Sequence, residues 1–115
     1  MSELSISVSA REFGAGTCAV IYVAGEADLT TTSLSDALTA ETAKKPDLLL
    51  VDLSGLQFID STALRMIITA HLRVQRDGGT LALVHPAPVI ARVVRLMGVD
   101  QLMPVYDSVD EAITC

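Results

Sequence analysis

A serine that directly follows an aspartate is the most informative chemistry in this sequence. Ser61 comes directly after Asp60, beyond the apolar run 48–51 and the connection that follows it. A serine hydroxyl is a weak nucleophile unless a neighbouring base takes its proton. The sequence around Ser61 has no such base, and the chain contains neither a GxSxG elbow nor a glycine loop that would cradle phosphate. The pattern therefore favours a serine that is modified, and we expect the protein not to be an enzyme.

The histidines and cysteines do not change this expectation. His71 lies about two and a half helical turns beyond Ser61, on the apolar side of a predicted helix, where a packing role is expected. His85 precedes a proline at a predicted strand end and indicates no particular chemistry. Cys18 and Cys115 have no CxxC spacing, so we predict reduced thiols, no metal site and no cofactor.

Phosphorylation is the modification that suits Ser61. A phosphate adds a charge of about −1.5 to −2, and the backbone N–H groups at a helix start favour an anion, although Asp60 beside it does not. Two local roles are open: Ser61 is the N-cap of the helix, or Asp60 is the cap and the Ser61 hydroxyl points outward. A partner packed over this helix end would meet a bulky, hydrated dianion.

Two further aspartates are candidates for the same site. Asp28 either caps the first predicted helix or serves a partner, by positioning the Ser61 hydroxyl or docking a kinase. Asp52 follows an apolar strand and either braces the next segment or accepts phosphate, as in receiver domains. The receiver interpretation lacks support, because no acidic pair follows the first strand and the segment 101–105 contains no lysine.

The periodicity of the chain predicts an α/β fold with a mostly parallel central sheet, an N-terminal β-hairpin and four helices. Alternating and continuous apolar patterns predict strands, and stripes at spacings of three to four predict helices. The expected strands are 4–8, 17–24, 48–51, 80–84 and 102–105. The expected helices are 32–44, 62–76, a third after Pro88 with Ile90, Val93, Val94 and Met97 on its apolar face, and a fourth after Ser108.

This order predicts where the acidic residues meet. Sites on parallel sheets lie beyond the carboxyl ends of the strands. The segments 25–28 and 53–61 each follow a predicted strand end, so we expect them to share one rim. The predicted partner surface consists of this rim and the exposed side of the helix that follows it, with Asp28, Asp60, Ser61, Thr62 and Arg65.

Composition limits the classes of function. A chain of 115 residues with 50% hydrophobic residues is expected to form one domain over 1–115. Its net charge of −6 argues against direct binding of nucleic acid, which selects basic surfaces. No segment approaches the roughly 20 apolar residues of a membrane span, so we expect a cytoplasmic protein with no membrane partner.

The segment 52–64 resembles the STAS domain of the bacterial anti-sigma factor antagonist family. Its sequence, DLSGLQFIDSTAL, is similar to the family pattern D-L-S-x-[VL]-x-[FY]-[IM]-D-S-[ST]-G-L. Supporting matches are Gly25–Asp28, which is similar to the family's G-E-[LI]-D, the pair Gly78–Gly79 before a strand, and the segment 97–102. The sequence departs from the pattern at Ala63, where the family usually has glycine, and alanine favours a helix by roughly 1 kcal/mol more than glycine does.

The resemblance implies a regulatory cycle. The unphosphorylated protein would bind an anti-sigma factor that is also a serine kinase, and so release a sigma factor for transcription. The kinase would use ATP to phosphorylate Ser61, which the family register favours over Thr62, and a serine phosphatase would reverse this. The resemblance also matches Asp28 to the rim aspartate that supports phosphorylation. Two alternatives remain at this stage: a STAS scaffolding module without its own phosphorylation cycle, and a small enzyme or nucleotide-binding protein that uses the acidic rim.

Overall fold

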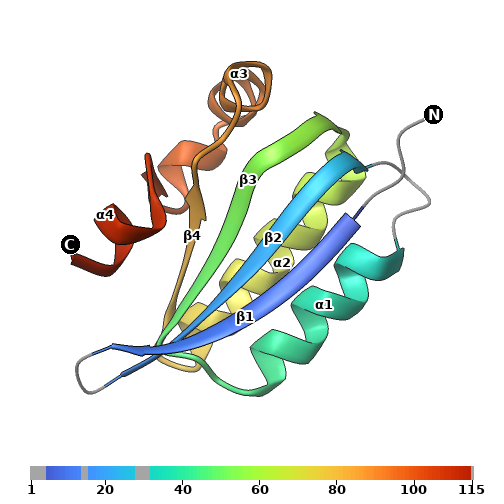
Figure 1. Ribbon diagram of the computed structural model, residues 1–115. Helices are drawn as coiled ribbons and strands as arrows, with labels where there is room; N and C mark the ends of the chain where they lie inside the picture. Colours follow the sequence, from blue (N-terminus) through green and yellow to red (C-terminus); the bar gives the residue numbers. More distant parts are fainter. Residues whose placement is uncertain (1–4, 14–15, 28–31, 115) are drawn as a thin grey trace.

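The computed structural model describes residues 5–13, 16–27 and 32–114, which form one α/β domain (Figure 1). The elements follow the predicted order of a hairpin and then alternating helices and strands. They are β1 (Ser5–Phe13), β2 (Gly16–Ala27), α1 (Thr32–Ala43), β3 (Leu48–Ile59), α2 (Ser61–Arg76), β4 (Thr80–Val84), α3 (Pro88–Leu96), a 3-10 turn (Val99–Gln101), β5 (Val105–Tyr106) and α4 (Val109–Thr114).

The sheet confirms the predicted topology. Its strand order is β1-β2-β3-β4-β5, with β1 antiparallel to β2 and each later pair parallel. The hairpin follows from the direct β1–β2 connection, whereas each parallel pair needs a crossover segment between its strands. The strands β3 and β4 pair from Leu48↔Thr80 to Asp52↔Val84, and their apolar runs are buried on both faces.

Helices cover both faces of the sheet, to different extents. In Figure 1, α1 and α2 lie side by side behind β1, β2 and β3, and α4 lies beside β4. The larger core fills the α1–α2 face, and the smaller core lies under α4. Strand residues alternate between the two cores: Ala19, Ile21, Leu49, Val51, Leu81 and Leu83 belong to the larger core, and Cys18, Val20, Leu48, Leu50, Ala82 and Val84 to the smaller one.

The strands β2 and β3 are longer than predicted. The sequence predicts that Gly25 ends the second strand and Val51 the third, but the two strands continue side by side to the pair Ala27↔Ile59. The pairing continues through two register shifts, between Tyr22/Ala24 and Gly25/Glu26. Such irregularities insert extra residues without ending the ladder. The main consequence is that β3 runs up to the residue before Asp60.

The C-terminal part of the sheet also differs from the prediction. The segment predicted as the strand 102–105 begins with a turn, because the N–H groups of Leu102 and Met103 bond to Val99 O at 2.9 and 3.2 Å. The strand β5 is only Val105–Tyr106, paired with the end of β4. None of the helices in the described part of the chain has the length and apolar character that a membrane crossing demands.

Candidate functional site

The helix α2 is capped by Asp60. The backbone of Asp60 is extended (φ −102°, ψ 177°), and its Oδ1 accepts a hydrogen bond from the Ala63 N–H at 2.9 Å. The first bond of the helix runs from Leu64 N–H to the Asp60 carbonyl at 3.1 Å. Of the two local roles open for Ser61, that of the N-cap is therefore wrong, and the aspartate performs it.

Ser61 is consequently the first residue of the helix, and it is exposed. Its hydroxyl makes no hydrogen bond to another described residue. Thr62 follows and is half-buried, and Arg65, one turn further along, is exposed. Ser61, Thr62 and Arg65 thus occupy the start of one helix, which brings together three of the five predicted partner-binding residues beside the capping Asp60.

A shallow hollow opens beside Ser61. It has a volume of about 160 Å³, and it lies between the first turns of α2 and the turn that follows α3. The α2 residues Ser61, Leu64, Arg65 and Ile68 form one wall, and Met97 and Val99 form the other. The Ser61 hydroxyl thus stands at the edge of a largely apolar depression.

Three large apolar side chains at and after the end of α3 are exposed, and one of them, Met97, also lines this hollow. Leu96 is 74%, Met97 57% and Leu102 52% exposed. We call these three residues the α3 patch. The prediction that Met97 belongs to the packed face of the third helix is wrong, because α3 ends at Leu96 and Met97 is its C-cap, followed by Gly98 in the left-handed region at φ 74°. Sequence reasoning missed these exposed residues, since Met97 continues the apolar stripe of the third predicted helix and Leu102 begins the predicted strand 102–105.

Only part of the predicted acidic rim, formed by the segments 25–28 and 53–61, lies within the described residues. The backbone ends of β2 and β3 lie side by side at Glu26↔Phe58 and Ala27↔Ile59, so the chain segments before Asp28 and before Asp60 approach each other. Asp28 itself, and the capping role predicted for 28–32, lie outside the described residues. Phe58 adds an exposed aromatic side chain, 48% accessible, close to this rim.

The other two residues considered for chemistry, Asp52 and His71, have structural positions. Asp52 sits within β3, half-buried, and its Oδ1 accepts the Ser54 N–H at 2.9 Å, so it braces the chain as one of its two predicted roles states. His71 is buried at 8% exposure on the apolar side of α2, which confirms its packing position. Ten residues separate it from Ser61, or about 15 Å along the helix. Within the part of the chain that the structure describes, no three metal-ligating side chains gather.

The chain is similar in sequence and in fold to known proteins. The STAS domain model matches residues 14–112. The anti-sigma-F factor antagonist RsfB of Mycobacterium tuberculosis is 28% identical over 97 residues, which cover 84% of this chain and 79% of RsfB. The crystal structure of an anti-sigma factor antagonist from Mycobacterium paratuberculosis has a TM-score of 0.83 and 29% identity, over 97% of this chain and 92% of that one.

The fold likeness extends to more distant proteins. The unphosphorylated form of the anti-sigma factor antagonist SpoIIAA has a TM-score of 0.72 at 17% identity, over 93% of each chain. The phosphorylated form of SpoIIAA from Bacillus has a TM-score of 0.69 at 18% identity, over 96% of this chain and 97% of that one. These two comparisons concern the fold alone. The family model spans most of the chain, and the chain belongs to the STAS domain family.

Proposed function

We propose that this protein is an anti-sigma factor antagonist whose binding to its partner is switched by phosphorylation of Ser61. The observation that carries the proposal is the exposed Ser61 hydroxyl, which makes no hydrogen bond in the described structure and stands beside an apolar hollow. The similarity to RsfB and to the anti-sigma factor antagonist of Mycobacterium paratuberculosis supports the antagonist role. In the unphosphorylated state the protein binds an anti-sigma factor with serine kinase activity, and a sigma factor is released.

The capping arrangement explains how the helix tolerates the modification. The kinase transfers the γ-phosphoryl group of ATP to the Ser61 oxygen, ADP leaves, and the hydroxyl proton is lost. Because the cap bond belongs to Asp60 and not to Ser61, the transfer removes no bond that holds the helix. The new dianion is favoured by the N-terminal amides of α2, so the fold is retained while the surface changes.

The partner surface that we propose has a polar and an apolar part. Asp60, Ser61, Thr62 and Arg65 form the polar part, and Asp28 is proposed to join it from the neighbouring strand end. The hollow and the α3 patch form the apolar part, which suits the hydrophobic centre of a protein interface. A phosphate on Ser61 would stand at the boundary between the two parts, where a packed partner leaves no room for its hydration. A serine phosphatase would restore the binding form, in the cytoplasm.

The phosphorylation step is tested by intact mass. The protein is mixed with kinase-type anti-sigma factors from the same cell and Mg-ATP, and fragmentation locates any phosphate. We expect one phosphate on Ser61 and none in Ser61→Ala. Phosphate on Thr62 would show that Thr62, and not Ser61, is the acceptor. Phosphate on Asp52 would indicate that the protein functions as a receiver domain. Stable binding without any modification would contradict the switch and favour the scaffolding function.

The binding step is tested with two substitutions of the same side chain. Ser61→Ala removes an exposed hydroxyl without adding charge, so its affinity for the anti-sigma factor should match that of the unmodified protein. Ser61→Glu places a charge in the contact and should weaken binding by about 10-fold or more, the cost of a desolvated, unpaired charge. Calorimetric titration of the three proteins measures this. Equal affinities of the three proteins would contradict the proposal that a charge at residue 61 switches binding.

A further inference from the structure

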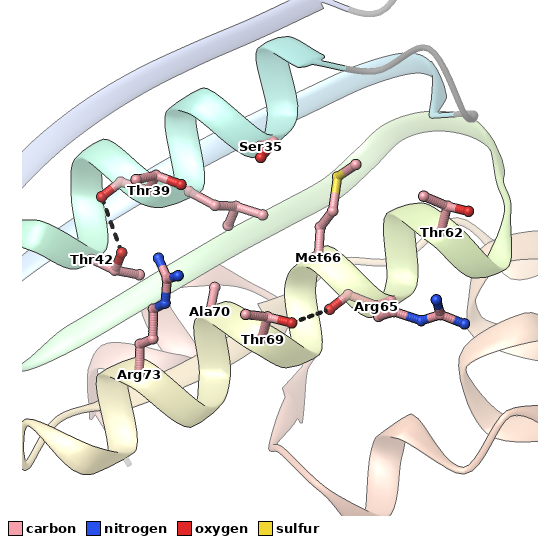
Figure 2. A pocket seen from close by; sticks show the side chains of 10 residues that line it. Ser35, Thr39, Thr42, Thr62, Arg65, Met66, Thr69, Ala70 and Arg73 are labelled. Carbon is pink, nitrogen blue, oxygen red and sulfur yellow. Dashed lines mark hydrogen bonds between the residues drawn. The ribbon is translucent and has the colours of Figure 1, made fainter.

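A second depression lies on the other side of α2, between it and α1 (Figure 2). It has a volume of about 240 Å³. Both helices contribute to its walls: Ser35, Leu38, Thr39 and Thr42 from α1, and Thr62, Arg65, Met66, Thr69, Ala70 and Arg73 from α2. We call it the α1–α2 groove. The groove lies between two helices that run side by side (Figure 1). It therefore suits a segment of chain better than a compact small molecule, whose pockets have volumes of about 300–1,000 Å³.

Hydroxyl groups line this groove on both sides. They belong to Ser35, Thr39, Thr42, Thr62 and Thr69. The Thr42 and Thr69 hydroxyls donate to the carbonyls of Thr39 at 3.1 Å and of Arg65 at 2.9 Å, as the dashed lines in Figure 2 mark. The hydroxyls of Ser35, Thr39 and Thr62 make no hydrogen bond within the described residues, so they are available as donors. Between the hydroxyls, Leu38, Met66 and Ala70 form an apolar floor.

The groove has an arginine near each end and no acid along it. Arg65 and Arg73 line it, and none of its lining residues is acidic. They are eight residues apart on one helix, or about 12 Å along its axis. In Figure 2 the Arg73 guanidinium reaches toward Thr42, while that of Arg65 extends away from Arg73. Both side chains are without an ion pair among the described residues.

Positive charge continues beyond the Arg73 end. An adjoining hollow shares Thr39, Thr42 and Arg73 with the groove and adds two cations, Lys45 and Arg76, and one acid, Asp77. In an acidic chain, four of the eight lysine and arginine residues thus gather where α1 and α2 end: Lys44, Lys45, Arg73 and Arg76. Lys44 is paired with Glu41 at 3.0 Å, and Arg76 lies 3.9 Å from Asp77.

Helix stability alone does not account for this arrangement. The helix dipole favours Arg73 and Arg76, which lie in the last turn of α2. It gives no support to Arg65, which lies near the start of the helix, and it does not require unbonded hydroxyls between the two arginines. Arginine and hydroxyl groups together are the donors that bind carboxylates.

We propose that the α1–α2 groove binds an acidic segment of a partner protein. The segment carries two carboxylates, one for each arginine, and an apolar side chain between them that rests on Leu38 and Met66. Charge complementarity selects this occupant, since the groove is cationic in a protein of net charge −6. The groove shares Thr62 and Arg65 with the proposed Ser61 surface, so the test relies on Arg73, which lies more than three helical turns from Ser61.

The test uses a synthetic helical peptide with two glutamates eight residues apart and a leucine midway. Fluorescence anisotropy at low salt measures its dissociation constant. Arg73→Gln should weaken binding about fivefold, and replacing both peptide glutamates by glutamine should weaken it at least as much. The matched control is Arg92→Gln, which removes the same charge from an exposed position on α3, outside the groove, and should leave binding unchanged.

Three outcomes would overturn the proposal. The first is the same affinity for the wild type and Arg73→Gln, and the second is no binding at a peptide concentration of about 1 mM. The third comes from amide NMR shifts, if pyrophosphate moves the signals of Thr39, Thr42 and Arg73 as strongly as the peptide does, since this would indicate a general anion site. Phosphorylation of Ser61 should proceed normally in Arg73→Gln, so a failure of this proposal is distinguishable from a failure of the proposed switch.

Discussion

Neighbouring residues divide two tasks at the start of α2. Asp60 supplies the acceptor for the Ala63 N–H, and Ser61 supplies an exposed hydroxyl with no structural bond among the described residues. A serine that capped its own helix would lose the cap geometry on phosphorylation. Here Asp60 holds the cap without Ser61, which suits the proposed switch, in which phosphorylation changes the surface charge and does not unfold the helix.

This division predicts the effect of removing the carboxylate. Asp60→Ala leaves the Ala63 N–H without its acceptor and should lower the free energy of unfolding by about 1 kcal/mol. Asp60→Asn is the matched control, because asparagine caps about as well while it carries no charge. Urea denaturation of the three proteins measures the difference. An Asp60→Ala protein as stable as Asp60→Asn would show that the cap contributes nothing to stability.

At the scale of elements, the irregular pairing of β2 and β3 determines where Ser61 stands. Two register shifts let β3 reach Ile59 beside Ala27, so that the chain turns into α2 at the sheet rim. A glycine lies at the first shift. A Cβ on Gly55 would come within 2.5 Å of the Tyr22 Oη and 2.8 Å of the Ala24 Cβ. The close approach of the two strands therefore requires a residue without a side chain.

Gly55→Ala tests this requirement. The Tyr22 hydroxyl is the far end of a side chain that can move, but the Ala24 Cβ is attached to the paired strand, so the strands must separate. We expect the free energy of unfolding to fall by about 1–3 kcal/mol, the usual cost of overpacking. Ser54→Ala, at the exposed neighbouring position, is the control and should change little. Thermal unfolding compares the two, and equal midpoints would contradict the steric argument.

At the scale of the whole molecule, apolar side chains serve two purposes. Those on the sheet are enclosed between helices, and Leu83 is 0% exposed in the larger core. The α3 patch is exposed although the chain has an ample core to bury its residues. Met97 lines the same hollow as Ser61, the proposed phosphorylation site, and large exposed apolar side chains of this kind suit an interaction surface. The fold therefore keeps stability and proposed partner binding in separate places.

A pair of leucine substitutions should separate these purposes. Leu83→Ala leaves a cavity in the core and should lower the free energy of unfolding by about 2–5 kcal/mol. Leu96→Ala, at a position 74% exposed, should change it by about 0.5 kcal/mol or less but weaken binding to the anti-sigma factor. Denaturation and calorimetric titration measure the two effects. Unchanged binding in Leu96→Ala would exclude this residue from the partner surface.

Most of the fold follows from local patterns in the sequence. The order of strands and helices, the parallel sheet with its N-terminal hairpin, and the outward position of Arg65 all derive from periods that a single element imposes. The chemistry at 60–61 is likewise visible in the sequence, although two capping roles fitted it equally. The aspartate and the serine both have short side chains that can accept a cap bond. Only the extended backbone of Asp60 in the folded chain shows that Asp60 is the cap.

The sequence by itself determined the order of the elements and singled out Ser61 as the candidate phosphate acceptor. The tertiary structure alone decided the length of β3, the exposure of Met97 and the α1–α2 groove. These features depend on contacts between segments far apart in the chain: β3 continues because β2 pairs with it, and the groove exists because α1 and α2 pack side by side on one face. Local periodicity predicts which face of an element is apolar. Whether another element covers this face depends on how the whole chain packs.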